Sequence, residues 1–378
     1  MATSCYHAGR ESYGDRFSFI PSTMPTTALQ ALRDSGIRVA SDTAEYRQIE
    51  EFQAALSDAT TNPSLVLAAV SKPEYAHIVQ EAVDFAQRKL KSTSVKEVTA
   101  LAVDRALVQV GVNISRIVPG RVSVSVDPRI GYDTRAIIRK AETLVALLEE
   151  LDIPRSRILI KIPATYEGIC AARTLEHPSA GEPTHTNLTL IFSRIQAIAC
   201  AQAGLSVISP FIGRVKDWWD AQGGSPSQEL SQHPGILLVQ NIRSTYSAHG
   251  YSSKTQIMAA GFRAVEEVVE LGKYGVEGGP DLVTLPPNLL DGLRRRKYVE
   301  PTVKFDPVPI DMEATPEYFG SASDSVGGAS LYARDILEEK IAAVKVAEGL
   351  AKFSADAQIL EDLVKRKVIE STEVSAML

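Results

Sequence analysis

The sequence is poor in cysteine and has no metal-ligand spacing. Three of its 378 residues are cysteines (Cys5, Cys170 and Cys200), and neither CxxC nor HExxH occurs. A small, odd number of cysteines fits a reducing compartment better than a disulfide framework. We therefore expect a cytoplasmic protein without a metal, in which Cys170 and Cys200 pack as small core side chains on helices.

Long apolar runs and nucleotide-binding signatures are also missing. No stretch approaches the roughly 20 apolar residues that span a bilayer, and the N-terminus lacks a basic start followed by an apolar run, as secretory signals have. Neither GxGxxG nor GxxxxGK[ST] occurs, so dinucleotide and P-loop nucleotide binding lack their signatures. A net charge of −6 argues against a general nucleic-acid binder but leaves room for a local basic pocket. We expect no cofactor, no membrane and no nucleic-acid partner.

What the sequence does contain is a regular alternation of strand-like and helical segments. Amphipathic helical stretches such as 133–151 separate eight short apolar runs. Alternation of this kind predicts a parallel sheet, and eight units are the number that closes a barrel. The expected fold is α/β, a (β/α)8 TIM-type barrel, with strands at 36–43, 58–65, 121–127, 157–164, 185–192, 205–214, 255–263 and 281–287.

The two ends of the chain differ from this pattern. Residues 1–27 are polar and unpatterned, which predicts a mobile N-terminal arm before a barrel domain at 28–300. Residues 301–378 begin with an irregular, proline-containing segment and then become helical. We expect two additional C-terminal helices there, the first including 333–353, packed over the barrel or its mouth.

Lys161 is the first candidate for chemistry. In RILIKIPA, strand alternation places Leu159, Lys161 and Pro163 on one face, opposite three isoleucines. Burial inside a barrel disfavours the ammonium form, and a neutral amine can add to a carbonyl group to form an imine. From this segment alone, a lysine that reaches solvent or pairs with a carboxylate is the commoner alternative.

Polar residues recur where the other predicted strands end, and in this fold the carboxyl ends of the strands build the active site. Individually they have simpler explanations, such as helix caps for Asp42 and Asn62 or strand propensity for Thr189. Their repetition at the ends of five strands, or six with the strand of Lys161, favours a site, and two arginines there suit a phosphate monoester. The residues are Asp42, Thr60, Asn62, Asn187, Thr189, Ser209, Arg214 and Arg263.

These motifs resemble the transaldolase family, in its longer branch with C-terminal helices. The matching stretches lie between about 36 and 290 and include DATTNPSL, PGRVSVSVD, RILIKIPATYEGI, NLTLIF and ISPFIGR. The resemblance implies a TIM barrel that transfers a dihydroxyacetone unit between sugar phosphates without a cofactor, as in the pentose phosphate pathway. The expected partner is a small-molecule carbonyl substrate, and a homodimer stays open.

The resemblance also implies a role for each residue. Lys161 matches the lysine that forms the Schiff base, Asp42 the acid that assists C–C cleavage, and Thr189 the residue that positions a catalytic water. Asn62 and Asn187 would hold donor hydroxyls, and both arginines the phosphate. The full set implied to bind substrate is Thr60, Asn62, Ser125, Asn187, Ser209, Phe211, Arg214 and Arg263.

Two positions depart from the family's pattern. Ser125 stands where the family has a glutamate that moves protons, and Gly261 where it usually has a serine. A hydroxyl cannot replace a general base, whose loss typically costs about 10²–10⁴-fold. Three alternatives therefore stay open: a transaldolase, a repurposed aldolase, lyase or condensing enzyme that keeps the lysine imine, and a non-catalytic barrel that binds sugar phosphates.

Overall fold

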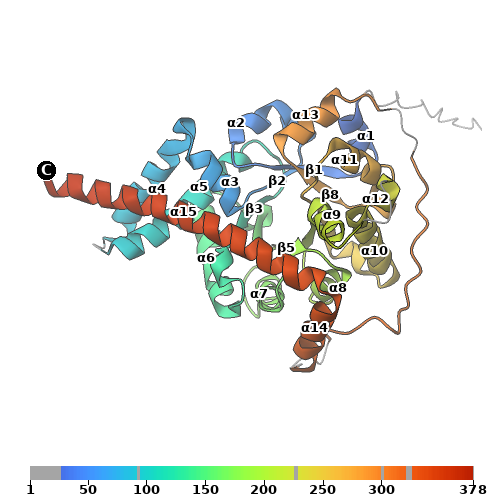
Figure 1. The fold of residues 1–378 in the computed structure, drawn as a ribbon. Helices are drawn as coiled ribbons and strands as arrows, with labels where there is room; N and C mark the ends of the chain where they lie inside the picture. Colours follow the sequence, from blue (N-terminus) through green and yellow to red (C-terminus); the bar gives the residue numbers. More distant parts are fainter. Residues whose placement is uncertain (1–26, 92–93, 225–228, 299–301, 321–325, 378) are drawn as a thin grey trace, which may run out of the picture.

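Eight parallel strands close into a barrel in the computed structural model, which describes residues 27–377 except 92–93, 225–228, 299–301 and 321–325. Each strand pairs with the next in the sequence, and β8 closes the ring by pairing with β1. The predicted (β/α)8 barrel is confirmed (Figure 1). The strands are β1 (Arg38–Asp42), β2 (Asp58–Thr60), β3 (Val122–Ser125), β4 (Ile158–Pro163), β5 (Thr186–Ile191), β6 (Val207–Pro210), β7 (Gln256–Ala259) and β8 (Leu282–Leu285).

Helices surround the barrel and connect its strands. The first group is α1 (Ala28–Asp34), α2 (Tyr46–Ile49), α3 (Pro63–Val70), α4 (Ala76–Leu90), α5 (Val95–Ser115), α6 (Thr134–Glu149) and α7 (Tyr166–Glu176). The second is α8 (Arg194–Gln202), α9 (Ile212–Ala221), α10 (Pro234–Ala248), α11 (Val265–Gly272), α12 (Gly275–Gly278) and α13 (Pro287–Arg295). Short 3-10 turns, among them η3 (Pro128–Ile130), lie in the loops.

The alternation within β4 explains which side chains enter the barrel. Leu159 packs with Val207, Met258 and Leu282 in a small apolar layer contributed by four strands. The isoleucines of β4 belong instead to the large core between strands and helices. Lys161 is two residues beyond Leu159, so it points into the barrel one layer closer to the carboxyl ends of the strands.

All eight strands are shorter than the predicted runs, and three of them end well before the predicted end. The run 255–263 ends as a strand at Ala259, so Arg263 lies in the following loop and does not close a strand. The run 58–65 ends as a strand at Thr60, because Asn62 caps α3 with its side chain and Pro63 occupies the first helical position. The run 205–214 ends as a strand at Pro210, and α9 begins two residues later. Arg214 therefore lies on a helix and does not close a strand.

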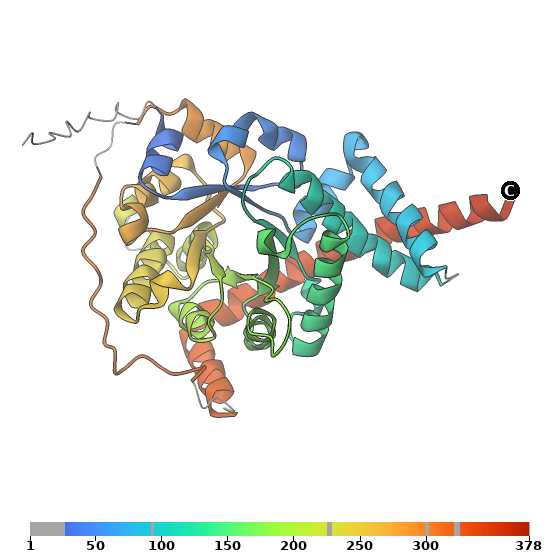
Figure 2. The same cartoon turned by 180° about the vertical axis from the view of Figure 1, so that it is seen from behind.

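The C-terminal helices α14 (Val326–Glu339) and α15 (Ile341–Met377) are present, but their boundary was predicted wrongly. Lys340 adopts a left-handed backbone with φ of 69°, which ends α14 inside the stretch expected to form one helix. Helix α15 crosses in front of the barrel in Figure 1 and behind it in Figure 2. It contacts α3, η3, β5 and α9, so it covers part of the mouth. The expected N-terminal arm falls almost entirely on residues 1–26, outside the described residues.

Helix α5 corrects one sequence expectation. Its 21 residues are long and apolar enough to cross a membrane by length and composition. Two thirds of its most apolar window is buried against the rest of the protein, as in a core helix. Cys170 and Cys200 lie on α7 and α8 as expected, and Cys200 is fully buried.

Candidate active site

Lys161 lies near the carboxyl end of the barrel interior, with 6% of its surface exposed. Its Nζ atom is 3.5 Å from the carbonyl oxygen of Thr61, a long and weak hydrogen bond. Burial lowers the pKa of the Lys161 amine below its usual range, and the negative charge of Asp42 partly opposes this effect. The site therefore favours the neutral, nucleophilic amine.

Ser125 lies directly beside Lys161. The two residues are register partners on β3 and β4, and the Ser125 hydroxyl oxygen is 3.4 Å from the Thr61 carbonyl that Lys161 also contacts. The hydroxyl of Thr189 is buried and has no hydrogen-bond partner among the described residues. Ser125, Lys161 and Thr189 line a common cavity of about 20 Å³. This is room for about one water molecule, which would satisfy the Thr189 hydroxyl.

Asp42 ends β1 and is fixed by threonines on two neighbouring strands. Thr60 donates to Asp42 Oδ1 at 2.8 Å, and the hydroxyls of Thr60 and Thr284 are 2.7 Å apart. Thr60 is fully buried. The Asp42 carboxylate is thus held in one orientation, and its negative charge acts on Lys161.

The two predicted asparagines differ in their surroundings. Asn187 is fully buried in the barrel, where it accepts from Ser209 Oγ at 2.7 Å and donates to Ser123 Oγ at 3.2 Å. Asn62 accepts from the backbone N–H of Leu65 at 3.0 Å, so the helix-cap explanation of this residue is correct. Asn62 nevertheless lines the same cavity as Lys161.

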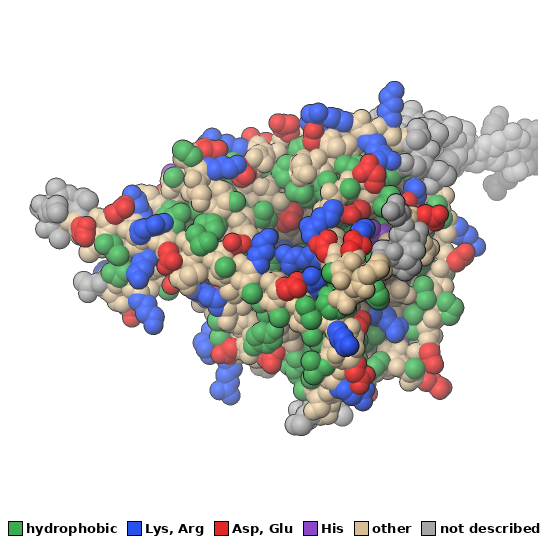
Figure 3. Space-filling model, in the orientation of Figure 1, with side chains coloured by type: hydrophobic (Ala, Val, Ile, Leu, Met, Phe, Trp, Pro, Cys, Tyr) green, Lys and Arg blue, Asp and Glu red, His purple; other side chains and the backbone are tan. Residues whose placement is uncertain are grey.

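The two predicted arginines lie near each other, Arg214 on α9 and Arg263 in the β7–α11 loop. The Arg214 guanidinium lies between two aromatic rings, 5.3 Å from that of Phe211 and 5.6 Å from that of Phe353. Burial lowers the pKa of Arg214, and the positive charge of Arg263 lowers it further. Two neighbouring cations of this kind have the charge that suits an anion such as phosphate. Figure 3 shows basic and acidic side chains side by side in the middle of this face.

Asp217, which sequence reasoning missed, forms an ion pair with Arg263. Its carboxylate accepts from Arg263 Nη2 at 2.7 Å. About half of each side chain is exposed (52% for Arg263 and 49% for Asp217), so the ion pair is weak and a bound anion can compete for it.

Gly261 has a backbone reason for being glycine. Its φ is +69°, in the left-handed region, and an added Cβ atom would lie 3.1 Å from the Phe211 ring. A serine here would be strained, so the backbone conformation of this loop itself favours glycine.

Comparison with known proteins identifies the family of this chain. The family described as transaldolase/fructose-6-phosphate aldolase matches residues 39–364. The chain belongs to this family. Transaldolase of Saccharomyces cerevisiae is 40% identical over 341 residues, which is 90% of this chain and 95% of that protein. A probable transaldolase of Dictyostelium discoideum is 38% identical (87% and 95% covered), and transaldolase A of Pasteurella multocida is 39% identical (90% and 99% covered).

In this member of the transaldolase family, sequence reasoning missed the contribution of α15. Leu350 and Phe353 line the cavity that contains Lys161, and Phe353 also stacks on Arg214. The sequence did predict that C-terminal helices pack over the barrel or its mouth. The helical pattern alone did not show which of its residues reach the site.

Gly349 allows α15 to approach the mouth closely, and Gly349→Ala should destabilise the fold. An added Cβ atom would lie 2.6 Å from Leu190 Cδ2 and 3.1 Å from the Arg214 guanidinium. Leu190 is fully buried and cannot move aside. We expect a loss of about 1–3 kcal/mol in the free energy of unfolding, despite the gain of about 1 kcal/mol from helix propensity.

The measurement is urea unfolding, with Gly327→Ala as the matched control. Gly327 lies on α14 with nothing within 4 Å of its added Cβ atom, so this variant should be neutral or stabilising. Equal changes for the two variants would contradict close packing at Gly349.

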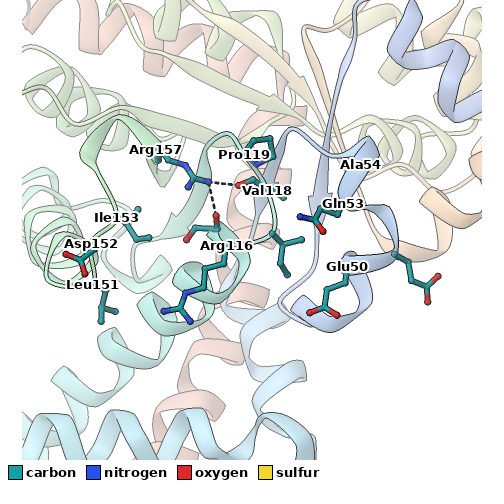
Figure 4. Close-up of a pocket in the computed structure, with 13 residues that line it drawn as sticks. Glu50, Gln53, Ala54, Arg116, Val118, Pro119, Leu151, Asp152, Ile153 and Arg157 are labelled. Carbon is teal, nitrogen blue, oxygen red and sulfur yellow. Dashed lines mark hydrogen bonds between the residues drawn. The ribbon is translucent and has the colours of Figure 1, made fainter.

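A larger open groove of about 1060 Å³ lies away from this site (Figure 4). It is lined by loop residues that precede β2, β3 and β4, so it lies at the amino ends of the strands. Its Arg157 guanidinium already donates to the carbonyls of Ser115, Val118 and Gly120. Arg157 therefore holds these loops together, and the described residues that line the groove do not include a lysine.

Proposed function

We propose that the protein is a transaldolase-type transferase that moves a dihydroxyacetone unit between sugar phosphates through an imine on Lys161. The observation that carries the proposal is a buried lysine with a lowered pKa, inside a barrel and within the electrostatic reach of Asp42. Family membership supports it, because the relatives named above are transaldolases. As part of the same proposal, we assign the protein to the cytoplasm and its reaction to the pentose phosphate pathway.

Each step of the proposed reaction uses a group described above. The Lys161 amine adds to the ketone of the donor, and loss of water gives an iminium ion that serves as the electron sink. Asp42 accepts the proton of the adjacent hydroxyl as the C–C bond breaks and the first aldehyde leaves. The remaining enamine then attacks the acceptor aldehyde, and hydrolysis returns free Lys161.

The other predicted residues would bind and orient the substrate. Asn62 and Asn187 would hold donor hydroxyls, and the unpartnered Thr189 hydroxyl would position the water used in imine formation and hydrolysis. Arg214 and Arg263 would bind the phosphate group. The remaining members of the proposed substrate site are Thr60, Ser125, Ser209 and Phe211.

Ser125 favours a second candidate function, a repurposed aldolase, lyase or condensing enzyme. None of the eleven described residues that line the cavity at Lys161 has a carboxylate. Asp127, two positions along the chain, binds Arg129 through both of its oxygens. It is therefore not free to serve as the missing base. An imine would still form, but the fate of the enamine could differ.

Trapping with borohydride tests the proposal. The protein is incubated with fructose 6-phosphate, reduced, and analysed by intact mass and peptide mapping. We expect one stable adduct on the peptide that contains Lys161 and none in protein reduced without the sugar. An absence of adduct would remove fructose 6-phosphate as a donor, and a screen of other carbonyl compounds would then separate the repurposed enzyme from a non-catalytic barrel.

A further inference from the structure

A buried histidine and a buried glutamate meet beneath the proposed phosphate site. His233 precedes α10 and is 3% exposed, and Glu267 lies on α11 and is 5% exposed. His233 Nδ1 accepts from the backbone N–H groups of Gly235 and Ile236, at 3.1 and 3.4 Å. The hydrogen of the neutral ring is therefore on Nε2, the nitrogen that lies 3.3 Å from Glu267 Oε1.

The second oxygen of Glu267 holds the backbone of Arg263. Oε2 accepts from the Arg263 N–H at 2.7 Å, and the N–H of Ala264 also bonds to this carboxylate. Burial would raise the pKa of Glu267, but the interactions with His233 and the two amides outweigh it, so the pKa is lowered. Glu267 is thus a buried carboxylate that accepts from two backbone amides. His233 Nε2 lies 3.3 Å from Oε1, within ion-pair distance, but is not aligned for a hydrogen bond to any described residue.

The pair lies where three helices begin. Gly235 packs against Ile212, the first residue of α9, since an added Cβ atom would lie 2.3 Å from its carbonyl oxygen. Gly213 packs against Arg263 in the same way, 2.7 Å from its Cγ atom. The start of α10 is therefore tied through His233 and Glu267 to the loop that carries Arg263, and through Gly235 to the start of α9.

We propose that His233 and Glu267 are positioning residues that hold Arg263 for the phosphate group of the substrate. The inference rests on the proposed function for the chemical identity of the anion. The ion pair with Asp217 is at the surface and holds the guanidinium weakly. The backbone of Arg263 is fixed by a partly buried, charge-assisted hydrogen bond to Glu267, which is stronger than the surface ion pair. This bond determines the position of the Arg263 Cα atom, from which the side chain extends.

An amide cannot replace this carboxylate. Each oxygen of Glu267 faces a nitrogen, the Arg263 amide at Oε2 and His233 Nε2 at Oε1. The NH2 group of a glutamine would therefore face an N–H group on either side, which opposes donor to donor in a buried place. Glu267→Gln should therefore shift the loop and weaken phosphate binding while Lys161 stays in place on the opposite side of the barrel.

The first measurement is the binding of inorganic phosphate to the full-length protein by calorimetry. We expect Glu267→Gln to weaken binding roughly tenfold, as misplacement of a charged hydrogen-bonding group does. Glu266→Gln is the matched control, because Glu266 is the preceding residue, is 55% exposed and forms a surface ion pair with Arg296. It should leave phosphate binding unchanged.

The second measurement compares acceptor aldehydes with and without phosphate. Glu267→Gln should raise the KM for erythrose 4-phosphate by a similar factor and leave kcat and the KM for erythrose nearly unchanged. A purely structural role would lower kcat for both aldehydes. His233→Asn is the second variant, because asparagine still caps α10 but is too short to reach Glu267. It should show the same selective change even where Glu267→Gln fails to fold.

The outcomes separate this inference from the proposed function. If Arg263→Ala weakens phosphate binding but Glu267→Gln and His233→Asn do not, the positioning role is wrong and the phosphate site stands. If the wild-type protein binds phosphate but yields no borohydride adduct, the transferase proposal fails and the calorimetric test still decides the role of the pair. If Arg263→Ala leaves phosphate binding intact, both assignments at Arg263 are wrong.

Discussion

Lys161→Met should abolish transfer of the dihydroxyacetone unit and at the same time stabilise the folded protein. Methionine keeps the volume of the side chain but cannot form an imine, so we expect kcat to fall by at least about 10⁴-fold. Within the part of the chain that the structure describes, Lys161 donates no hydrogen bond to a carboxylate, and its hydrogen bond to the Thr61 carbonyl is long, at 3.5 Å. Removing this poorly solvated amine should raise the free energy of unfolding by about 1–2 kcal/mol at pH 7.

The gain in stability should depend on pH in a defined direction. Because burial lowers the pKa of Lys161 in the folded state, the unfolded chain binds the proton more tightly. The native lysine therefore costs most stability at low pH, and this cost disappears as pH rises toward the ordinary lysine pKa. Chemical denaturation at pH 7 and pH 10 should show a larger advantage of Lys161→Met at pH 7.

Lys140→Met is the matched control, and its effect should have the opposite sign. Lys140 is 2.6 Å from Asp104, a carboxylate with 8% side-chain exposure, and lies outside the cavity at Lys161. Its loss leaves a buried carboxylate unpaired and should destabilise by about 1–3 kcal/mol, with transfer activity retained. Destabilisation by Lys161→Met would mean that the amine has a strong partner and is not poised as a neutral nucleophile.

These contrasting lysines show how far sequence reasoning reaches. The alternation in β4 places Lys161 inside the barrel, because a strand's period of two is a local property. The eight strand-like runs likewise predict the closed barrel. No local property of the sequence predicts whether a lysine that points into the barrel forms an ion pair with a carboxylate. That depends on residues distant in sequence, such as Asp42 and Thr61.

The errors lie where one element meets another. Arg214 follows an apolar run, and this pattern predicts a strand end. In the structure β6 pairs with β7 over a short stretch, and α9 then begins at Ile212. The helix breaks at Lys340, although no glycine or proline lies beside this residue in the sequence. This break allows α15 to turn and lie across the mouth, where Phe353 reaches Arg214. Tertiary packing, which a single sequence does not display, determines both.

Ser125→Glu should raise the rate of transfer between fructose 6-phosphate and erythrose 4-phosphate by about 10²-fold or more, the usual worth of a positioned general base. Ser125 is the register partner of Lys161, and both line the cavity that also contains the Thr189 hydroxyl. A carboxylate here would lie beside the water that this cavity can hold, and it could move protons during imine formation and hydrolysis.

The cavity sets the cost of this substitution. The cavity beside Leu350 and Phe353 has room for about one water molecule, whereas glutamate adds three heavy atoms to the side chain of serine. We therefore expect a loss of about 1–3 kcal/mol in stability from overpacking. Activity must be compared at a temperature where thermal unfolding shows both proteins to be folded.

Ser125→Gln separates the effect of the base from that of size. Glutamine has the same shape but cannot take up a proton, so it should share the loss of stability and show no gain in rate. The new carboxylate should also raise the pKa of Lys161 through its negative charge, which shifts the pH dependence of imine formation upward for glutamate and not for glutamine. If glutamate gives no gain over glutamine, in a protein that already forms the borohydride adduct, the enamine has a different fate. The serine then marks a repurposed enzyme.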